Sequence, residues 1–146
     1  MEQVLVLIKP EGMQKAIVGD VFSQFNGDLK LKGLKLVKPS TRLAQKHYEF
    51  LKDKFFYKQI VEYLTGKFHG GAPVVALVLE GTAAVKKCRD IAGATNPEEA
   101  APTSVRGKYG RITTKGLFEN VVHVSSSPEE ARREIALWFK KSELIK

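Results

Sequence analysis

The sequence lacks several features that would place it in a well-known class. It contains one cysteine, Cys88, among 146 residues, so no disulfide can form within the chain, which fits a reducing compartment. No window approaches the ~20 apolar residues that a membrane span needs. The short apolar run near Met1 has no basic segment before it, which argues against a signal peptide. The expected location is therefore the cytoplasm, with no membrane partner.

Motifs that bind phosphate or activate a nucleophile in common enzyme classes are also missing. There is no G-x-x-x-x-G-K-[ST] loop, no G-x-G-x-x-G fingerprint, and no H-R-D or D-F-G motif of a protein kinase. Cysteines and histidines at zinc spacing and a G-x-S-x-G elbow are absent as well. A chain of this sequence that transfers phosphate must therefore use another nucleophile or another cradle for the phosphates.

Acidic residues are in the minority, because 16 Asp and Glu stand against 24 Lys and Arg, a formal net charge of +8. A basic protein attracts polyanions, so nucleic acids, acidic membranes and nucleoside polyphosphates are all candidate ligands. Lysines that alternate with leucines in 29–37 fit a nucleic-acid-binding strand, but any half-exposed strand shows the same pattern. The net charge does not distinguish among these ligands, and it is explained equally well if most of the lysines only solvate the surface.

The remaining composition, 43% hydrophobic and 27% charged, is typical of a globular protein, and we expect one domain over 1–146. Apolar runs and alternation predict strands at 4–8, 29–37, 73–79 and 120–124, with a bulge at Gly33 that would keep the leucines of the second strand on the core face. Alternatively, that strand starts only at Leu34. Helical spacing predicts helices at 13–25, 40–52, 55–64, 81–91 and from Pro128 onward.

The ends of these elements carry recognisable signals. Ser40 and Ser127 are expected N-caps, and Glu130 would complete a capping box with Ser127. We expect loops at 65–72 and 94–119 and a loose tail at 141–146. The order of elements predicts an α/β (α+β) fold of the ferredoxin-like βαββαβ type, a four-stranded antiparallel sheet covered by helices.

Four segments resemble, in the same order, segments of the nucleoside diphosphate kinase family. They are VLVLIKPEGMQKAIVGDVFSQF, HYEFLKDKFF, RDIAGATNPEEAAPTSVRGKY and ENVVHVSSSPEEARREIALWF. The first resembles the family's first strand and helix with its Lys-Pro-Asp-Gly turn. The last resembles its Asn-x-x-His segment and closing helix. A single match would be weak evidence, whereas four in order from end to end are specific.

The resemblance implies roles for residues at the reacting atoms. The histidine that is phosphorylated in the family corresponds to His123, and the glutamate that orients it corresponds to Glu134. Tyr48 corresponds to the tyrosine beside that histidine, and Ser125 to the serine just beyond it. A neutral imidazole is a competent nucleophile. The implied catalytic residues are His123, Lys9, Tyr48, Asn120, Glu134 and Ser125.

The resemblance also implies a nucleotide site, in which Phe56 corresponds to the phenylalanine that stacks on the base. Lysine and arginine groups neutralise phosphate charge, and phosphoryl transfer depends mainly on positioning and charge. The implied nucleotide-binding residues are Lys9, Phe56, Arg89, Thr95, Arg106 and Asn120. His47 and His69 match no role in the family.

The chain departs from the family pattern at several positions. Val124 stands where the family often has a glycine after the histidine, and Ser126 where it often has an aspartate. A valine at this position is harmless if its backbone is an ordinary strand. The segment GKFHG (66–70) resembles an insertion, and the loop 107–119 is longer than usual.

The implied function is transfer of the γ-phosphoryl group of a nucleoside triphosphate, such as ATP, to a nucleoside diphosphate through phospho-His123. Mg²⁺ is implied as a cofactor held mainly by the nucleotide phosphates. The family forms tetramers or hexamers, so a homo-oligomer is expected. Two alternatives stay open. One is a nucleotide-binding module that has lost catalysis, suggested by Val124 and Ser126, and the other is a nucleic-acid-binding protein, suggested by the net charge.

Overall fold

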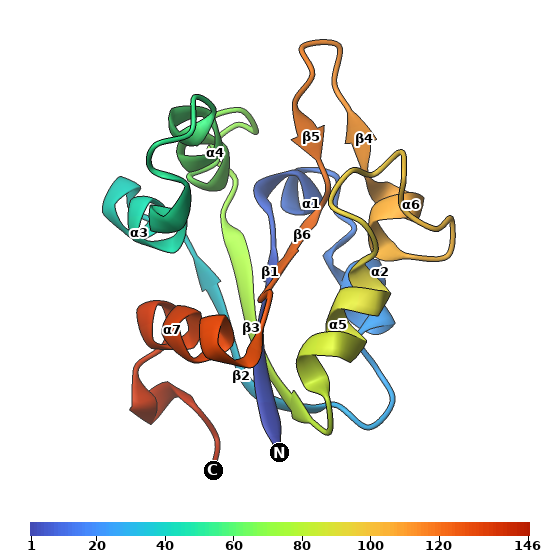
Figure 1. Cartoon of the computed structure of the whole chain (residues 1–146), viewed down its shortest axis with the longest axis vertical. Coiled ribbons are helices and arrows are strands. Elements are labelled where there is room, and N and C mark those ends of the chain that lie inside the picture. The colour runs from blue at the N-terminus through green and yellow to red at the C-terminus, as the bar shows by residue number, and fades with distance from the viewer.

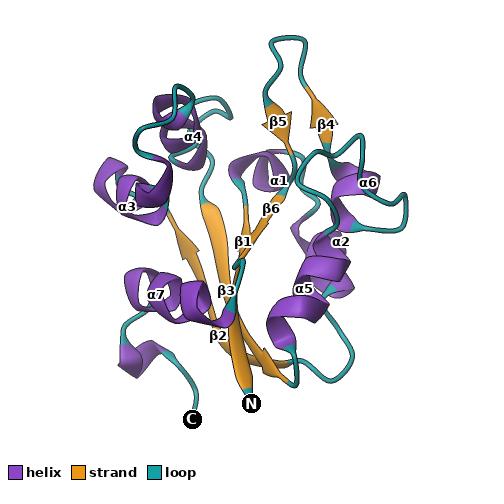
Figure 2. Cartoon of the chain, in the orientation of Figure 1, coloured by secondary structure: helices purple, strands orange, loops and turns teal.

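A computed structural model describes all 146 residues and shows a four-stranded antiparallel sheet with helices on both faces (Figures 1 and 2). The strands are β1 (Glu2–Ile8), β2 (Lys30–Val37), β3 (Val74–Gly81) and β6 (Val122–Val124), in the spatial order β2-β3-β1-β6. Every pairing between neighbours is antiparallel. The first and third strands of the βαββαβ core therefore lie in the middle, and the predicted ferredoxin-like fold is confirmed.

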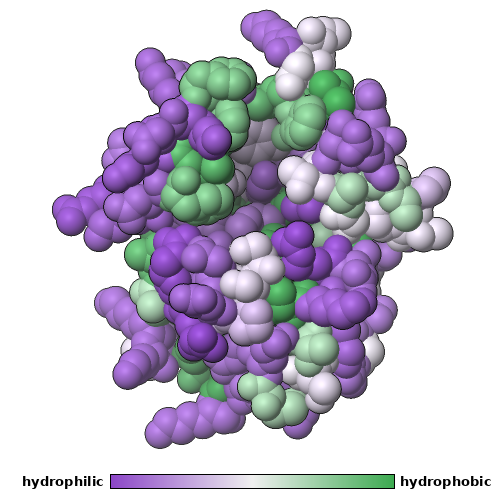
Figure 3. Space-filling model, viewed as in Figure 1, coloured by the Kyte–Doolittle hydropathy of each residue, from purple (hydrophilic) through white to green (hydrophobic).

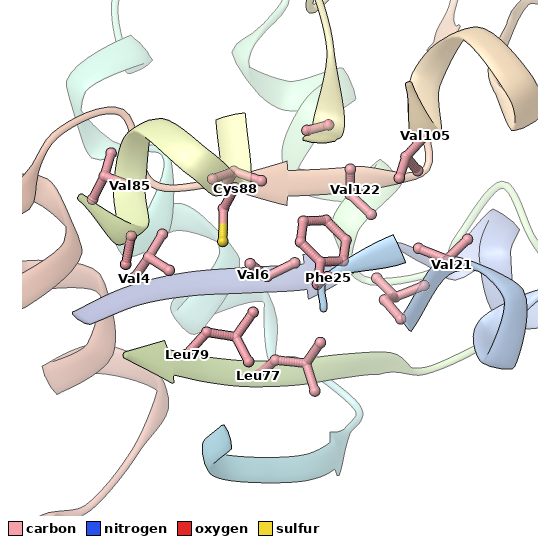
Figure 4. Close-up of a cluster of buried hydrophobic side chains, with 14 of the residues drawn as sticks. Val4, Val6, Val21, Phe25, Leu77, Leu79, Val85, Cys88, Val105 and Val122 are labelled. Atoms are coloured by element: carbon pink, nitrogen blue, oxygen red, sulfur yellow. The ribbon is translucent and has the colours of Figure 1, made fainter. Parts of the chain in front are cut away.

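The central strands are apolar at successive positions because both faces of the sheet are covered. In β1, Val4, Val6 and Ile8 belong to one buried cluster, and Leu5 and Leu7 belong to another. The first cluster, drawn in Figure 4, packs against α1 (Pro10–Gln14), α2 (Val18–Gln24), α5 (Ala84–Ala92) and α6 (Val105–Tyr109). The second packs against α3 (Thr41–His47), α4 (Tyr57–Leu64) and α7 (Pro128–Trp138).

Helix ends follow the sequence signals closely. The Ser40 hydroxyl accepts the Leu43 N–H at 3.1 Å, and the Ser127 hydroxyl accepts the Glu130 N–H at 3.1 Å, so both predicted N-caps are confirmed. The prediction that Glu130 completes a capping box is wrong, because its carboxylate accepts hydrogen bonds from Arg133 in the next turn of α7 and not from the Ser127 N–H. Cys88 is fully buried on α5, as expected of a packing residue. No helix in the chain has both the length and the apolar character to cross a membrane.

The prediction of one helix over 13–25 is wrong, because two short helices occupy this segment. Ala16 has a φ of 57°, and its N–H donates to Met13 O while the Ile17 N–H donates to Gly12 O. This pair of bonds is the Schellman pattern that ends a helix at a left-handed residue. Glycine usually fills that position, so the alanine gave no signal of a break.

The bulge in β2 is confirmed, since its pairing with β3 shifts between Leu31 and Gly33. The prediction that the leucines of β2 are buried is wrong. Leu31, Leu34 and Leu36 pair with residues of the first core cluster but remain 42%, 55% and 63% exposed. The leucines lie on the expected face, but no helix of the chain covers this edge of the sheet.

The segments predicted as a long loop and a loose tail are also more ordered than expected. Within 94–119 the chain forms α6 and a short hairpin of β4 (Arg111–Ile112) and β5 (Phe118–Glu119), which rises at the top of Figure 1. In the tail, a 3₁₀ turn spans Lys141–Glu143, and the Ile145 N–H donates to Lys32 O at 2.8 Å. The tail is ordered by a backbone bond to the distant β2, which local patterns cannot reveal, whereas α6 and the hairpin form through local backbone bonds in a segment whose composition is typical of a loop.

Gly107 can be used to test how closely α6, the helix that contains Arg106, packs against the backbone at Ala101. A Cβ at this position would overlap the backbone carbonyl of Ala101, which cannot move as a side chain can. We expect Gly107→Ala to lower the free energy of unfolding by about 1–3 kcal/mol. Gly19 of α2 has nothing within 4 Å of its ideal Cβ, so Gly19→Ala should raise stability by ~1 kcal/mol. Urea unfolding of both variants checks this, and equal effects would contradict it.

Candidate active site

His123 lies in β6, where strand alternation decides which way its ring points. Val122 and Val124 belong to the first core cluster, so His123 between them faces α7 on the other side of the sheet. There its Nε2 lies 3.1 Å and 3.0 Å from the two carboxylate oxygens of Glu134. A carboxylate accepts hydrogen bonds, so Nε2 carries the proton and Nδ1 holds the free lone pair. Nδ1 makes no hydrogen bond within the chain.

Glu134 is buried, with 2% of its surface exposed, and it is held by more than the histidine. The Ser125 hydroxyl donates to Glu134 Oε2 at 2.6 Å and accepts the Leu5 N–H at 3.1 Å. Burial works to raise the pKa of Glu134, but the hydrogen bonds from His123 and Ser125 outweigh it and leave that pKa below its ordinary value. The carboxylate is therefore ionised at neutral pH, which stabilises positive charge on the imidazole.

A second histidine packs against the first. The ring of His47 stands edge-on to that of His123, with centroids 4.4 Å apart and planes at 79°. The indole N–H of Trp138 donates to His47 Nδ1 at 3.1 Å, and the ring of Tyr48 lies 4.7 Å from that of His47. His47 is fully buried, and burial, followed by the nearby His123, lowers the pKa of His47 well below its ordinary value. It is therefore neutral.

Ligand atoms of His47, His123 and Glu134 lie within 4.8 Å of one another, which is a possible metal-binding arrangement. The tautomer of His47 argues against it. An indole N–H can only donate, so His47 Nδ1 must use its lone pair to accept from Trp138, and Nε2 must carry the proton. A metal ion needs a free lone pair on the imidazole. This cluster is better explained by packing and hydrogen bonding.

Lys9 follows β1 directly and lies beside Asn120. Lys9 Nζ donates to Asn120 Oδ1 at 2.8 Å, and the Asn120 amide donates to Thr95 O at 2.9 Å. Burial lowers the pKa of Lys9 to about 8, which Glu11 opposes and Arg106 reinforces. These two hydrogen bonds join the end of β1, the residue before the turn into β6 and the segment after α5, which are far apart in the sequence.

The backbone between Asn120 and His123 is unusual. Val121 has a φ of 73°, and the Val122 N–H donates to Asn120 O at 2.8 Å, which makes a three-residue γ-turn. A β-branched residue in this region is strained by about 1–3 kcal/mol and persists only where its surroundings fix it. Glu11, fully buried in α1, accepts the Val121 N–H at 2.7 Å, and Val121 O accepts the Lys9 N–H at 2.8 Å.

Arg106 supplies a second buried cation near this turn. Its guanidinium donates to Gly93 O and to Val122 O, both at 2.8 Å, and its Nε is buried without a partner. Burial lowers the pKa of Arg106 to about 10, and the charge of Arg89 acts in the same direction. Arg89 and Thr95 have exposed side chains, so they are free to contact a ligand.

The structure therefore joins most of the residues that the resemblance singled out. Tyr48 is buried beside His47, and burial, together with the carboxylates of Glu11 and Glu134, raises the pKa of Tyr48. Phe56 is the exception. It is half-buried at the start of α4, and its ring packs on that of Phe55, which is outside the hydrogen-bonded group, with centroids 5.3 Å apart. In Figure 3 the surface is hollowed between the α4 side and the side of the β4–β5 hairpin.

Sequence reasoning missed two residues that shape this site. His47 was given no role, yet it packs on His123, and its position next to Tyr48 was the available signal. Glu11, which stands where the family's Lys-Pro-Asp-Gly turn has its aspartate, was given no role either, yet it binds the strained turn. Val124 belongs to β6 and has no positive φ, so the valine in place of glycine brings no strain.

Comparison with known proteins points in one direction. Residues 2–144 match the family model described as nucleoside diphosphate kinase. The chain is 45% identical over 140 residues to the nucleoside diphosphate kinase of Caldanaerobacter subterraneus, covering 95% of this chain and 94% of that protein. The Aquifex aeolicus nucleoside diphosphate kinase structure superposes with a TM-score of 0.87 at 36% identity, covering 99% of both chains.

A further solved structure comes from Borrelia burgdorferi, with a TM-score of 0.89 at 29% identity, covering 99% of this chain and 90% of that one. It is a nucleoside diphosphate kinase with bound vanadate and ADP, a transition-state mimic. The family match spans nearly the whole chain, and the fold and sequence agree with it. The chain belongs to the nucleoside diphosphate kinase family and is a phosphotransferase.

Proposed function

We propose that His123 is the nucleophile through which this phosphotransferase moves the γ-phosphoryl group of a nucleoside triphosphate to a nucleoside diphosphate. The observation that carries the proposal is the pairing of His123 Nε2 with the buried carboxylate of Glu134. This pairing fixes the proton on Nε2 and leaves the Nδ1 lone pair available to attack phosphorus. Ser125 holds Glu134 in place from the other side.

The reaction takes place in two half-reactions. His123 Nδ1 forms a bond to the γ-phosphorus while the bond from that phosphorus to the β–γ bridging oxygen breaks, and the diphosphate leaves with the electron pair. The positive charge that develops on the imidazole is offset by Glu134, with which it shares the Nε2 proton. A terminal oxygen of the second diphosphate then attacks the phosphorus, and the bond to Nδ1 breaks.

Positive charge and hydrogen-bond donors surround the position where phosphates would bind. We assign Lys9, Arg89 and Arg106 to the phosphates, because phosphoryl transfer gains most from positioning and from neutralised charge. Asn120 and Thr95 complete the polar contacts to sugar and phosphate, and Tyr48 supports the histidine. Phe56 stacks on the base, and a stacking contact reads a π-face and not a base edge, so base specificity is low.

We include Mg²⁺ as a cofactor carried by the nucleotide phosphates. The carboxylates nearest the turn are already engaged, since Glu134 binds His123 and Ser125 and Glu11 Oε1 accepts the Val121 N–H. Mg²⁺ prefers oxygen ligands and keeps several waters, so phosphate oxygens and water fit it better than these side chains. Bound in this way, it would neutralise charge on the phosphates.

We also propose a homo-oligomer, a tetramer or a hexamer, in the cytoplasm. Support comes from Leu31, Leu34 and Leu36, which form an exposed apolar strip on the edge strand β2. A nucleic-acid-binding role has less support. The lysines of β2 that suggested it are paired with carboxylates: Lys32 lies 3.8 Å from an oxygen of Glu80, and Lys35 lies 2.9 Å from an oxygen of Glu143.

The nucleophile is tested with ATP labelled at the γ-phosphate, using wild type beside His123→Ala. We expect wild type to acquire acid-labile label and to release it to added GDP, and we expect the variant to acquire none. Phosphohistidine is identified by its stability in base and loss in acid. Nucleotide binding by wild type without any label would overturn the proposal and favour a binding module that has lost catalysis.

The role of Lys9 predicts a pH dependence. The ammonium group must be protonated to attract phosphate, and its pKa of about 8 means that this charge is lost as pH rises through that value. We expect kcat/KM, which reports the free enzyme, to fall above pH ~8. In Lys9→Arg the guanidinium stays charged, so this fall should move to higher pH. An unchanged pH profile in that variant would contradict the assignment.

The oligomer is tested by sedimentation velocity. We expect wild type to sediment as a multiple of its 16.2 kDa chain, and Leu34→Asp to shift towards smaller species because a charge would be buried in the contact. Lys58→Asp, at an exposed position of α4, is the matched control and should sediment as wild type does. A monomeric wild type would refute this part of the proposal.

A further inference from the structure

Glu119, the residue before Asn120, is a buried carboxylate that other segments hold in place. It ends β5 and is 4% exposed. Its Oε1 lies 2.7 Å from His69 Nε2, and its Oε2 accepts the Arg111 Nε–H at 2.5 Å. Lys15 Nζ approaches the same carboxylate to 3.8 Å. The partners come from the 65–72 loop, from β4 and from the turn between α1 and α2.

His69 is as buried as the carboxylate that it binds. It is 4% exposed, and its ring packs on that of Tyr63 with centroids 5.1 Å apart. His69 lies in the GKFHG segment (66–70), and Glu119 lies in the long segment 107–119. These are the two places where we expect the chain to differ in length from the family pattern, and the contact between His69 and Glu119 joins them directly.

The position of Glu119 gives this contact a consequence for the site. The strained γ-turn starts at the next residue, Asn120, and leads through Val121 into β6. After the turn, pairing with β1 holds the chain at Val122. Before the turn, the β4–β5 hairpin pairs over only two positions on each strand, and the hydrogen bonds that close its tip between Thr113 and Leu117 stay within the hairpin. The hairpin by itself is a weak anchor, so the side chain of Glu119 adds a hold on this end of the turn to the hydrogen bonds that Asn120 makes with Lys9 and Thr95.

We propose that Glu119, held by His69, is a positioning residue that fixes the strained turn and thereby places Asn120 and His123 for phosphoryl transfer. The inference rests on the proposed role of His123. The state of the carboxylate agrees with it. Burial works to raise the pKa of Glu119, but the hydrogen bonds from Arg111 and His69 outweigh it and lower that pKa, so the group is ionised at neutral pH. An ionised carboxylate accepts the strongest hydrogen bonds from these donors.

The test compares variants that remove or keep the hydrogen bond to Glu119. His69→Leu removes the donor, and His69→Gln keeps an amide N–H in its place. Glu119→Ala removes the carboxylate, and Glu98→Ala is the matched control at an exposed glutamate of the same segment. Circular dichroism confirms that each variant is folded at the assay temperature. If Glu119→Ala does not fold, the pair at His69 still decides the question.

Two measurements are made on each variant. The rate of label transfer from γ-labelled ATP to the protein in a single turnover should fall about tenfold in His69→Leu and Glu119→Ala, because small displacements of a reacting group cost this much or more. His69→Gln should recover most of the rate, and Glu98→Ala should match wild type. Hydrogen exchange of the Val121 N–H, which donates to Glu11, should become faster in the two impaired variants only.

The outcomes separate this inference from the proposed function. If wild type takes up label but His69→Leu and Glu119→Ala transfer it within about twofold of the wild-type rate, Glu119 does not position the site and the inference fails. If wild type takes up no label, the proposed nucleophile fails, and hydrogen exchange alone judges the turn. Unchanged exchange of Val121 would then overturn the inference.

Discussion

The arrangement of this site depends on the left-handed backbone of Val121. With a φ of 73° at this residue, the chain turns within three residues and enters β6 beside β1. Asn120 then faces Lys9 on one side of the turn, while His123 faces Glu134 on the other. An ordinary strand conformation at Val121 would point both side chains elsewhere. The backbone strain is tolerated because Glu11 and the backbone of Lys9 bind both polar groups of the turn.

Electrostatics at the site follow from a division of charge between its two sides. The side next to Asn120 holds buried cations, and burial lowers the pKa of Lys9 to about 8 and that of Arg106 to about 10. Both groups would be more stable in the presence of an anion, so the folded protein favours binding of phosphate. The side next to α7 holds the ionised Glu134, whose carboxylate is hydrogen-bonded to His123. The histidine therefore lies between a place for negative phosphate and a fixed negative charge.

Much of the fold could be predicted from the sequence because local patterns carry it. The apolar face of α7, with Ala131, Ile135 and Trp138, and its Ser127 cap were all evident in the order of residues. What could not be predicted depends on partners that are far away in the chain. Leu34 has the pattern of a core residue, and only the absence of a covering helix leaves it exposed. Ala16 and Val121 adopt positive φ without glycine, so no local signal marked either turn.

The same distinction applies to the site. Segments that resemble a known family identified His123, Glu134 and Lys9, and the hydrogen bonds of His123 to Glu134 and of Lys9 to Asn120 agree with that assignment. His47 and His69 remained without a role because their partners lie 91 and 50 residues further along the chain. A buried histidine says nothing about its contacts until the fold is known. Both turn out to be engaged, one by an indole and one by a carboxylate.

The two segments that we expect to differ in length from the family pattern, 66–70 and 107–119, meet in one contact between His69 and Glu119. A longer hairpin by itself would weaken the anchor of the strained turn, because added residues increase the freedom of the segment before Asn120. The 66–70 segment supplies His69, which binds the end of that hairpin at Glu119 in a site that is almost fully buried. Removing either partner alone would leave a buried polar group without its hydrogen bond, which is more costly than never having had the pair. The 66–70 segment and the β4–β5 hairpin therefore support each other, and a change in one constrains what the other can become.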